Sequence, residues 1–93
     1  MQFLKVTGNK INHEVTLYSL STCVWCKLIK LYLHDNSITY EFLDVDLLDE
    51  ADKVTVTQDI ISKGGSITYP TTIVDGKLVQ GYRIDYIKLL LEA

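Results

Sequence analysis

Two cysteines, Cys23 and Cys26, are the residues of this chain best suited to chemistry, and they are the only cysteines among its 93 residues. They lie where an apolar run typical of a strand, residues 15–18, gives way to a helical pattern. A Cys-x-x-Cys pair at such a junction is typical of a dithiol that cycles between two thiols and a disulfide. The spacing therefore predicts thiol–disulfide chemistry at these two residues.

The helix predicted after this junction gives each sulfur a role. If Cys23 opens the helix, its sulfur faces unpaired backbone N–H groups and the positive end of the helix dipole, and both favour the thiolate. Cys26 falls on the same helical face one turn later, so we expect it to be more buried. We therefore expect Cys23 to attack a substrate disulfide and Cys26 to resolve the mixed disulfide by attacking Cys23.

Other uses of the two cysteines have weaker support. A structural zinc site needs about four ligands, and only His13 and His34 remain to complete one. A structural disulfide between residues three apart closes a very short loop and removes little entropy from the unfolded chain. Two unrelated buried thiols are the last alternative, because a free cysteine is often a small core residue. We expect no metal site.

The composition predicts one packed domain spanning residues 1–93, because 47% of the residues are hydrophobic and the length suffices for a single core. The net charge of −3 argues against nucleic acid as a partner, since phosphate binding needs clustered Lys and Arg. No apolar run approaches the roughly 18 residues of a membrane span, and no secretory signal is evident. We expect a cytoplasmic protein, in which two thiols suit turnover.

Hydrophobic patterning and turn residues predict the elements before and after the cysteines. Apolar residues in 3–6 and 13–18, joined by a turn at Gly8-Asn9, predict a β-hairpin whose first arm is an added edge strand. We take residues 1–12 as an N-terminal β-arm. Ser21 or Thr22 is expected to cap the following helix, which ends near Asn36.

The second half of the chain predicts the rest of an α/β fold. Residues 38–45 read as a strand parallel to the first central strand, because a helix separates the two. Five acidic residues follow within positions 44–52. Because a helix dipole favours negative charge at the helix start, this cluster indicates the start of a helix more strongly than it indicates a metal site. Residues 48–63 are ambiguous between helix and strand. Asp75-Gly76 predicts a second hairpin, and residues 84–92 predict a last helix.

The order of these elements, the cysteine pair after the first central strand, and Thr68-Tyr69-Pro70 before a hairpin resemble the glutaredoxin branch of the thioredoxin-fold superfamily. The resemblance covers about residues 14–93. It implies a thioredoxin-like (glutaredoxin-type) mixed sheet with helices on both faces, here with an extra N-terminal strand. It also implies a cis Tyr69–Pro70 bond, leaving the Tyr69 backbone free to pair with a substrate chain; an ordinary trans proline is the alternative.

Three departures from the usual glutaredoxin pattern bear on the reductant. Typical glutaredoxins carry Cys-Pro-Tyr-Cys, a basic residue three positions before the first cysteine, and Gly-Gly followed by an acidic pair. This chain has Val24-Trp25, Leu20 and the run Gly81-Tyr82-Arg83-Ile84-Asp85 at those places. Because recognition of glutathione carboxylates needs charge-assisted hydrogen bonds, these departures argue against glutathione use. The pattern is similar to glutaredoxin-like redoxins that take electrons from thioredoxin reductase and supply ribonucleotide reductase.

The resemblance and the residues together predict a monomeric dithiol–disulfide oxidoreductase that reduces protein disulfides. Its cofactor is no more than the redox-active Cys23–Cys26 disulfide, and its electron donor is an enzyme of the thioredoxin-reductase type. The residues expected to contact substrate beside Cys23 are Val24, Trp25, Thr68, Tyr69, Pro70, Gly81 and Tyr82. A glutathione-dependent glutaredoxin is one alternative, and a carrier that binds an iron–sulfur cluster between two chains through Cys23 is another.

Overall fold

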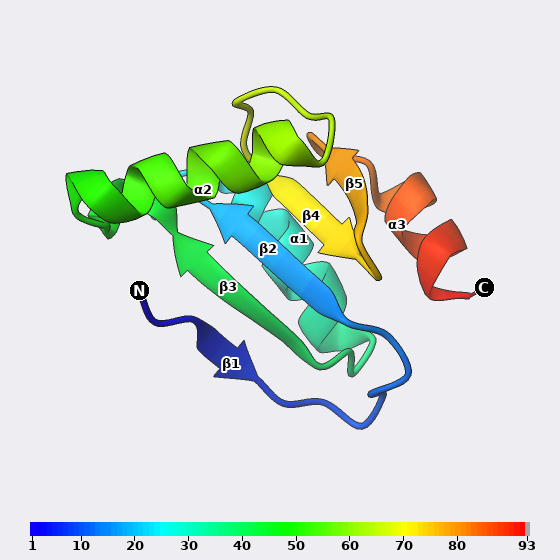
Figure 1. The fold of residues 1–93 in the computed structure, drawn as a ribbon. Coiled ribbons are helices and arrows are strands. Elements are labelled where there is room, and N and C mark those ends of the chain that lie inside the picture. Colours follow the sequence, from blue (N-terminus) through cyan, green and yellow to red (C-terminus); the bar gives the residue numbers. More distant parts are fainter. Residues whose placement is uncertain (93) are drawn as a thin grey trace.

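A mixed five-stranded sheet lies at the centre of the structure, a computed structural model in which residues 1–92 are described. The strands are β1 (Leu4–Val6), β2 (Val15–Ser19), β3 (Tyr40–Asp44), β4 (Thr71–Val74) and β5 (Lys77–Gln80). They lie in the order β1-β3-β2-β4-β5, with β2 parallel to β3 and antiparallel to β4 (Figure 1). The strand that leads to the cysteines is therefore the central one.

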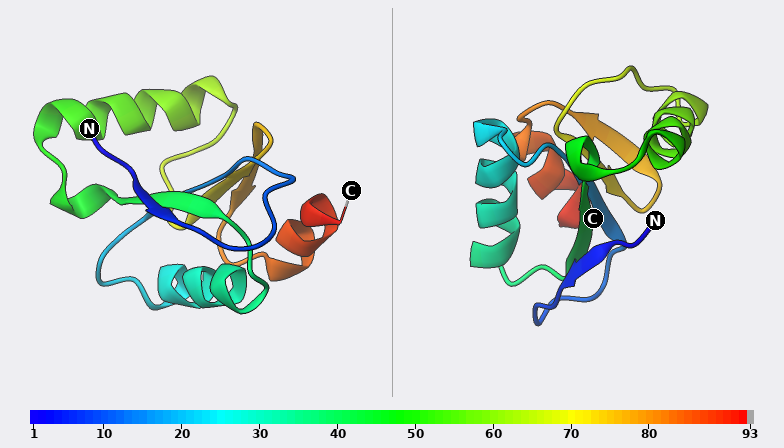
Figure 2. Two further views of the ribbon diagram at one scale, coloured as in Figure 1. Left: turned by 90° about the horizontal axis from the view of Figure 1, so that it is seen from below. Right: turned by 90° about the vertical axis from the view of Figure 1, so that its left-hand side faces the viewer.

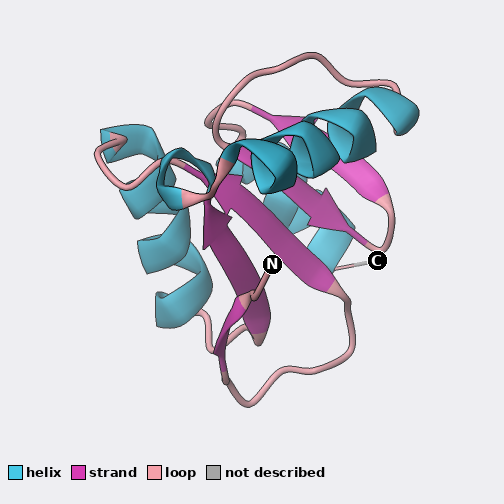
Figure 3. Ribbon diagram, turned by 60° about the vertical axis from the view of Figure 1, so that its left-hand side comes forward, coloured by secondary structure: helices cyan, strands magenta, loops and turns pink. Residues whose placement is uncertain are grey.

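Helices cover both faces of this sheet. Helices α1 (Val24–Asp35) and α3 (Ile84–Leu91) pack on one face, and α2 (Glu50–Ser62) packs on the other (Figures 2 and 3). A short 3-10 helix, η1 (Val45–Leu47), joins β3 to α2. The predicted mixed sheet with helices on both faces is confirmed. Within residues 1–92, no helix combines the length and apolar character needed to cross a bilayer.

Alternation of side chains along β2 and β3 builds two cores. Val15 and Leu17 of β2 pack with Ile29 of α1 and Ile87 of α3 on one face. Tyr18, the next residue of β2, points to the other face and packs in the cluster beneath α2. The period of two along a strand explains how one short strand supports helices on both sides. The sheet is thus packed between helices on both faces, and its central strand β2 leads into the connection to α1.

The N-terminal segment departs from the predicted hairpin. β1 is an edge strand, as expected, but it pairs antiparallel with β3 rather than with β2. The reason is that both edges of β2 are occupied, by β3 and β4, so the free edge of β3 is the one available to β1. Gly8 does not form the hairpin turn; it lies against residue 37, where an added Cβ would be 2.2 Å from the Ser37 carbonyl oxygen.

The remaining predicted elements are found, and the ambiguous stretch is resolved. Residues 48–63 are mostly helical, because Val56 and Ile60 on one face of α2 are fully buried against the sheet. This packing outweighs the low helix propensity of the β-branched residues there. The hairpin at Asp75-Gly76 is confirmed, since β4 and β5 pair antiparallel and both turn residues have positive φ.

Candidate functional site

Cys23 occupies the N-cap position of α1, at the end of the connection from the central strand. Its backbone is extended, its Sγ accepts a hydrogen bond from the Cys26 N–H at 3.2 Å, and its carbonyl accepts one from the Lys27 N–H at 3.1 Å. The prediction that Ser21 or Thr22 caps the helix is wrong. The N-cap is Cys23, whose thiol sulfur accepts the capping hydrogen bond. The sulfur therefore faces the unpaired N–H groups of the helix start.

Cys26 lies behind Cys23 in the first turn of α1 and is fully buried, whereas Cys23 is half-buried. Both are free cysteines. Burial, followed by the hydrogen bond with Cys23, raises the pKa of the Cys26 thiol to about 12, although the Leu20 backbone and the Lys30 charge act in the opposite direction. Cys26 thus keeps its proton near neutral pH. The Cys23 sulfur is partly accessible to solvent, whereas the Cys26 sulfur is buried.

The loop that carries Tyr69 and Pro70 is fixed to the strands beside it. The Tyr69–Pro70 bond is cis, as the resemblance implied. The Thr71 hydroxyl donates to the Thr68 carbonyl at 2.5 Å, and the Gly81 N–H donates to the Pro70 carbonyl at 2.8 Å. These two hydrogen bonds attach the loop to the start of β4 and to the segment after β5.

A shallow groove of about 350 Å³ brings together residues from three distant segments: Trp25, Tyr69, Pro70, Gly81 and Tyr82. The Trp25 and Tyr82 rings lie with their centroids 5.2 Å apart and tilted by 46°, and both remain about half exposed. None of the residues lining the groove carries a charge. The structure therefore places five of the predicted contact residues on one apolar surface beside the dithiol.

The other two predicted contact residues do not line this groove. Val24 lies in the first turn of α1 and is 65% exposed. Thr68 is exposed in the loop before β4, and its carbonyl is engaged by Thr71. Both lie next in sequence to residues of the groove, Val24 before Trp25 and Thr68 before Tyr69.

Asp46, one of the five acidic residues in positions 44–52, holds the connection before Cys23. The Asp46 carboxylate in η1 accepts hydrogen bonds from the Ser21 N–H at 2.8 Å and from the Ser21 hydroxyl at 2.5 Å. These bonds hold the pKa of Asp46 below its usual range. Only Asp49 caps α2, through the Asp52 N–H. Ser21 and Asp46 are 25 residues apart, and no sequence pattern links them.

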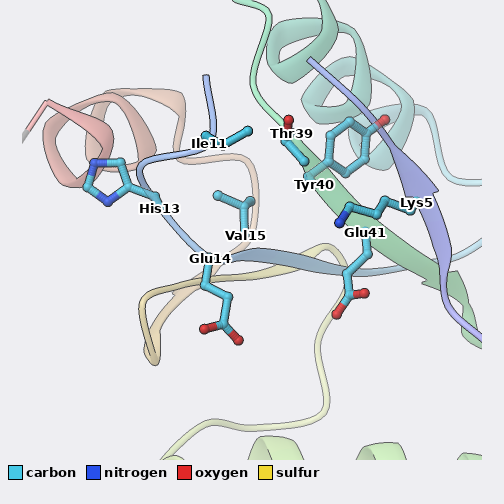
Figure 4. A pocket seen from close by; sticks show the side chains of 8 residues that line it. All are labelled: Lys5, Ile11, His13, Glu14, Val15, Thr39, Tyr40 and Glu41. Carbon is cyan, nitrogen blue, oxygen red and sulfur yellow. The ribbon is translucent and has the colours of Figure 1, made fainter. Parts of the chain in front are cut away.

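A second open cavity, of about 440 Å³, lies at the opposite end of β2 from the cysteines (Figure 4). Lys5 and Glu41 lie together on one side, and His13 lies on the other, where its Nδ1 is 2.5 Å from Asp75 Oδ2. The charges have mixed sign and do not converge on one point. Across residues 1–92, no cluster of three or more His, Cys, Asp or Glu side chains is arranged to hold a metal ion.

Comparison with known proteins agrees with this geometry. The glutaredoxin family model matches residues 15–79. The structure of a glutaredoxin from Methanosarcina mazei Go1 superposes with a TM-score of 0.87 at 29% identity, covering 100% of this chain and 90% of that one. The structure of methanoredoxin from Methanosarcina acetivorans gives a TM-score of 0.79 at 34% identity, covering 86% of this chain and 85% of that one. The thioredoxin-like fold expected from the sequence is thereby confirmed.

Curated relatives give the same answer. A glutaredoxin-like 8.6 kDa protein in the rubredoxin operon of Clostridium pasteurianum is 30% identical over 78 residues, covering 84% of this chain and 97% of that protein. A monothiol glutaredoxin of Caenorhabditis elegans is 31% identical over 81 residues, covering 84% of this chain, but the match spans only 53% of that protein. With its family model, its fold and its paired cysteines in agreement, the chain belongs to the glutaredoxin family of thiol–disulfide oxidoreductases.

Proposed function

We propose that this chain reduces disulfide bonds of other proteins, with Cys23 as nucleophile and Cys26 as resolving thiol. The observation that carries the proposal is the position of Cys23: its sulfur caps α1, 3.2 Å from the Cys26 N–H, with the Cys26 thiol buried behind it. The Cys23 thiolate attacks one sulfur of the substrate disulfide, and the other substrate sulfur leaves as a thiol. Cys26 then displaces the bound sulfur, leaving a Cys23–Cys26 disulfide and a fully reduced substrate.

The apolar groove supports a polypeptide as substrate rather than glutathione. Glutathione is a small zwitterion with two carboxylates, and its recognition needs charge-assisted hydrogen bonds. The groove has no charged lining residue, and Leu20 stands where glutaredoxins usually carry a basic residue. Trp25 and Tyr82 instead offer two half-exposed rings of the kind enriched at protein–protein contacts. The Tyr69 backbone is proposed to pair with an extended substrate segment.

The same features support a protein as the electron donor. We propose that an enzyme of the thioredoxin-reductase type reduces the Cys23–Cys26 disulfide, that ribonucleotide reductase is among the clients, and that the chain acts as a monomer without a further cofactor. A cytoplasmic setting suits this role, because a dithiol that turns over must be returned to its reduced form after each cycle.

One assay tests the donor and the client class together. Reduction of insulin and of ribonucleotide reductase is followed in parallel with two electron sources, thioredoxin reductase with NADPH and glutathione with glutathione reductase. The proposal expects turnover with the first source and little with the second. The reverse result would identify a glutathione-dependent glutaredoxin and overturn the proposed donor.

Two cysteine variants test the assigned roles. Cys23→Ser is expected to abolish turnover, because the nucleophile that attacks the substrate disulfide is lost. Cys26→Ser is expected to accumulate a covalent mixed disulfide with the client, visible on a non-reducing gel, because nothing displaces the bound sulfur. Full activity of Cys23→Ser would remove the assignment.

A further inference from the structure

Lys30 lies one helical turn after Cys26 on α1, so the two side chains share a face of the helix that looks toward the sheet. The Lys30 side chain is 22% exposed, which is low for a lysine in a surface helix. Its Nζ donates to Asp44 Oδ1 at 3.1 Å and lies 4.0 Å from the centroid of the Phe42 ring. The ammonium group is thus drawn onto the end of β3 instead of extending into solvent.

The Asp44 carboxylate that binds Lys30 is in turn fixed by a hydrogen bond from Ser19. The Ser19 hydroxyl donates to the same Asp44 oxygen at 2.6 Å and to the Leu43 carbonyl at 3.2 Å. Ser19 is fully buried and ends β2, the strand that leads to the cysteines. The resulting chain of contacts, from Ser19 through Asp44 to Lys30, fixes one positive charge beside the buried face of the first turns of α1.

A nearby positive charge favours the second half-reaction. To attack the mixed disulfide, the Cys26 thiol must release its proton and carry a negative charge in a site where burial opposes that charge. Its sulfur then bonds to Cys23 Sγ, the bond from Cys23 to the substrate sulfur breaks, and the leaving thiolate takes up a proton from solvent. Cys26 and Cys23 lose two electrons together, and the substrate disulfide gains them.

We propose that Lys30, held by Asp44 and Ser19, is a positioning residue for this resolving step, stabilising the negative charge that forms on Cys26. The inference rests on the dithiol function proposed above. The ionisable groups that act on Cys26 are Cys23 at the helix cap and Lys30 on the same helix, and Asp44 of β3 pairs with that lysine. Asp44 offsets part of the Lys30 charge, so the expected effect on the resolving step is modest. Of the two lysines in this helix, Lys30 is partly buried against β3, whereas Lys27 is exposed.

The test separates the two half-reactions with a small aromatic disulfide, 5,5′-dithiobis(2-nitrobenzoate). Attack by Cys23 releases a first coloured thiolate, and attack by Cys26 on the mixed disulfide releases a second. Stopped-flow rates are measured for the full reduced chain and for Lys30→Met, Lys30→Arg and Lys27→Met. Acidic buffers are included, because the ionised fraction of a thiol falls tenfold per pH unit and the second release slows enough to be resolved.

Removal of the Lys30 charge is expected to leave the first release unchanged and to slow the second by about three- to tenfold, the range for a nearby but partly screened charge. Lys30→Arg should restore most of the rate. Lys27→Met, which makes the same change in net charge at an exposed position of the same helix, should leave the rate of the second release unchanged. Equal second-release rates in Lys30→Met and the unaltered chain at every pH would overturn the inference.

A titration provides a readout that does not depend on turnover. In the Cys23→Ser background, the thiolate absorbance of Cys26 is followed against pH with and without Lys30→Met. The midpoint is expected to rise when the lysine is removed, and an unchanged midpoint would contradict the proposal. Failure of the proposed function itself has a different signature, since the first coloured thiolate would then be released as rapidly from Cys23→Ser.

Discussion

At the scale of single residues, the buried Cys26 thiol ties the stability of the reduced protein to pH. Burial raises its pKa from 9.0 to about 12, so the folded chain holds the proton more tightly than the unfolded chain does. As pH rises above about 9, the unfolded chain loses this proton first, and the folded state becomes less favoured until the pH reaches about 12. The stabilisation is complete below this window and is lost across it.

The oxidised protein has no thiol at this position and should lack that pH dependence. We expect the reduced form to lose stability relative to the disulfide form when urea unfolding is moved from neutral pH to about pH 10, inside the window set by linkage. Cys26→Ser serves as the control, because it removes the titrating group. A stability difference between the two redox forms that stays constant over this range would contradict the argument.

Two adjacent buried threonines on β4 offer a second test at this scale. Within residues 1–92, the Thr72 hydroxyl has no hydrogen-bond partner although the residue is fully buried. Thr71, equally buried, donates to the Thr68 carbonyl and accepts from Gln80. Thr72→Val should therefore raise the free energy of unfolding by about 1 kcal/mol, whereas Thr71→Val should lower it by about 1 to 3 kcal/mol. Equal effects in urea denaturation would contradict the hydrogen-bond assignment.

At the scale of elements, the attachment of the N-terminal arm depends on one close approach. The Gly8 N–H donates to the Thr39 hydroxyl at 2.8 Å, and that hydroxyl donates back to the Gly8 carbonyl at 2.9 Å. An added Cβ at Gly8 would meet backbone atoms of Ser37 at 2.2 and 2.4 Å, which no rotamer change relieves. A glycine is required here by proximity to another segment.

Gly8→Ala is accordingly expected to destabilise the chain by about 1 to 3 kcal/mol, the usual cost of overpacking. Faster hydrogen exchange of the β1 amides should accompany this loss, because the clash pushes the arm away from β3. Asn12→Ala, at an exposed position of the same arm, should change neither quantity. Unaltered exchange at Leu4 to Val6 in Gly8→Ala would show that the arm is attached in another way.

At the scale of the whole molecule, the N-terminal arm and the dithiol site lie on different parts of the sheet. The dithiol and the aromatic groove lie at the end where β2 runs into α1, and the N-terminal arm passes around the other end and along the outer edge of β3 (Figure 1). Phe3, just before β1, packs against Tyr18, whose hydroxyl donates to Asp59 of α2 at 2.6 Å. The arm therefore supports the face that α2 covers and lies away from the groove.

Deletion of residues 1–7 should lower the free energy of unfolding by about 2 to 3 kcal/mol, the contribution of one or two partly buried apolar side chains and a short edge strand. The rate of the first thiolate release from 5,5′-dithiobis(2-nitrobenzoate) should stay within a factor of about two, since Cys23 and its cap are untouched. A folded truncated chain with a greatly reduced rate would show that the arm contributes to the site.

The sequence alone determined those features that depend on local pattern. The apolar run before the cysteines predicted the central strand. Pro70 and Asp75-Gly76 predicted the second hairpin, and the helical spacing from Cys23 to Cys26 predicted a partly exposed sulfur in front of a buried one. Local hydrogen bonding and side-chain periodicity decide such elements within a few residues of chain.

Only the tertiary structure decided which distant segments meet. It placed β1 on β3, made residues 48–63 a helix by burying Val56 and Ile60, and brought Asp46 to Ser21 and Asp44 to Lys30 across 25 and 14 residues. Pairings of this kind follow from which sheet edge is free and which surface remains to be buried once the rest of the chain has packed. Those quantities belong to the folded molecule and to no single stretch of its sequence.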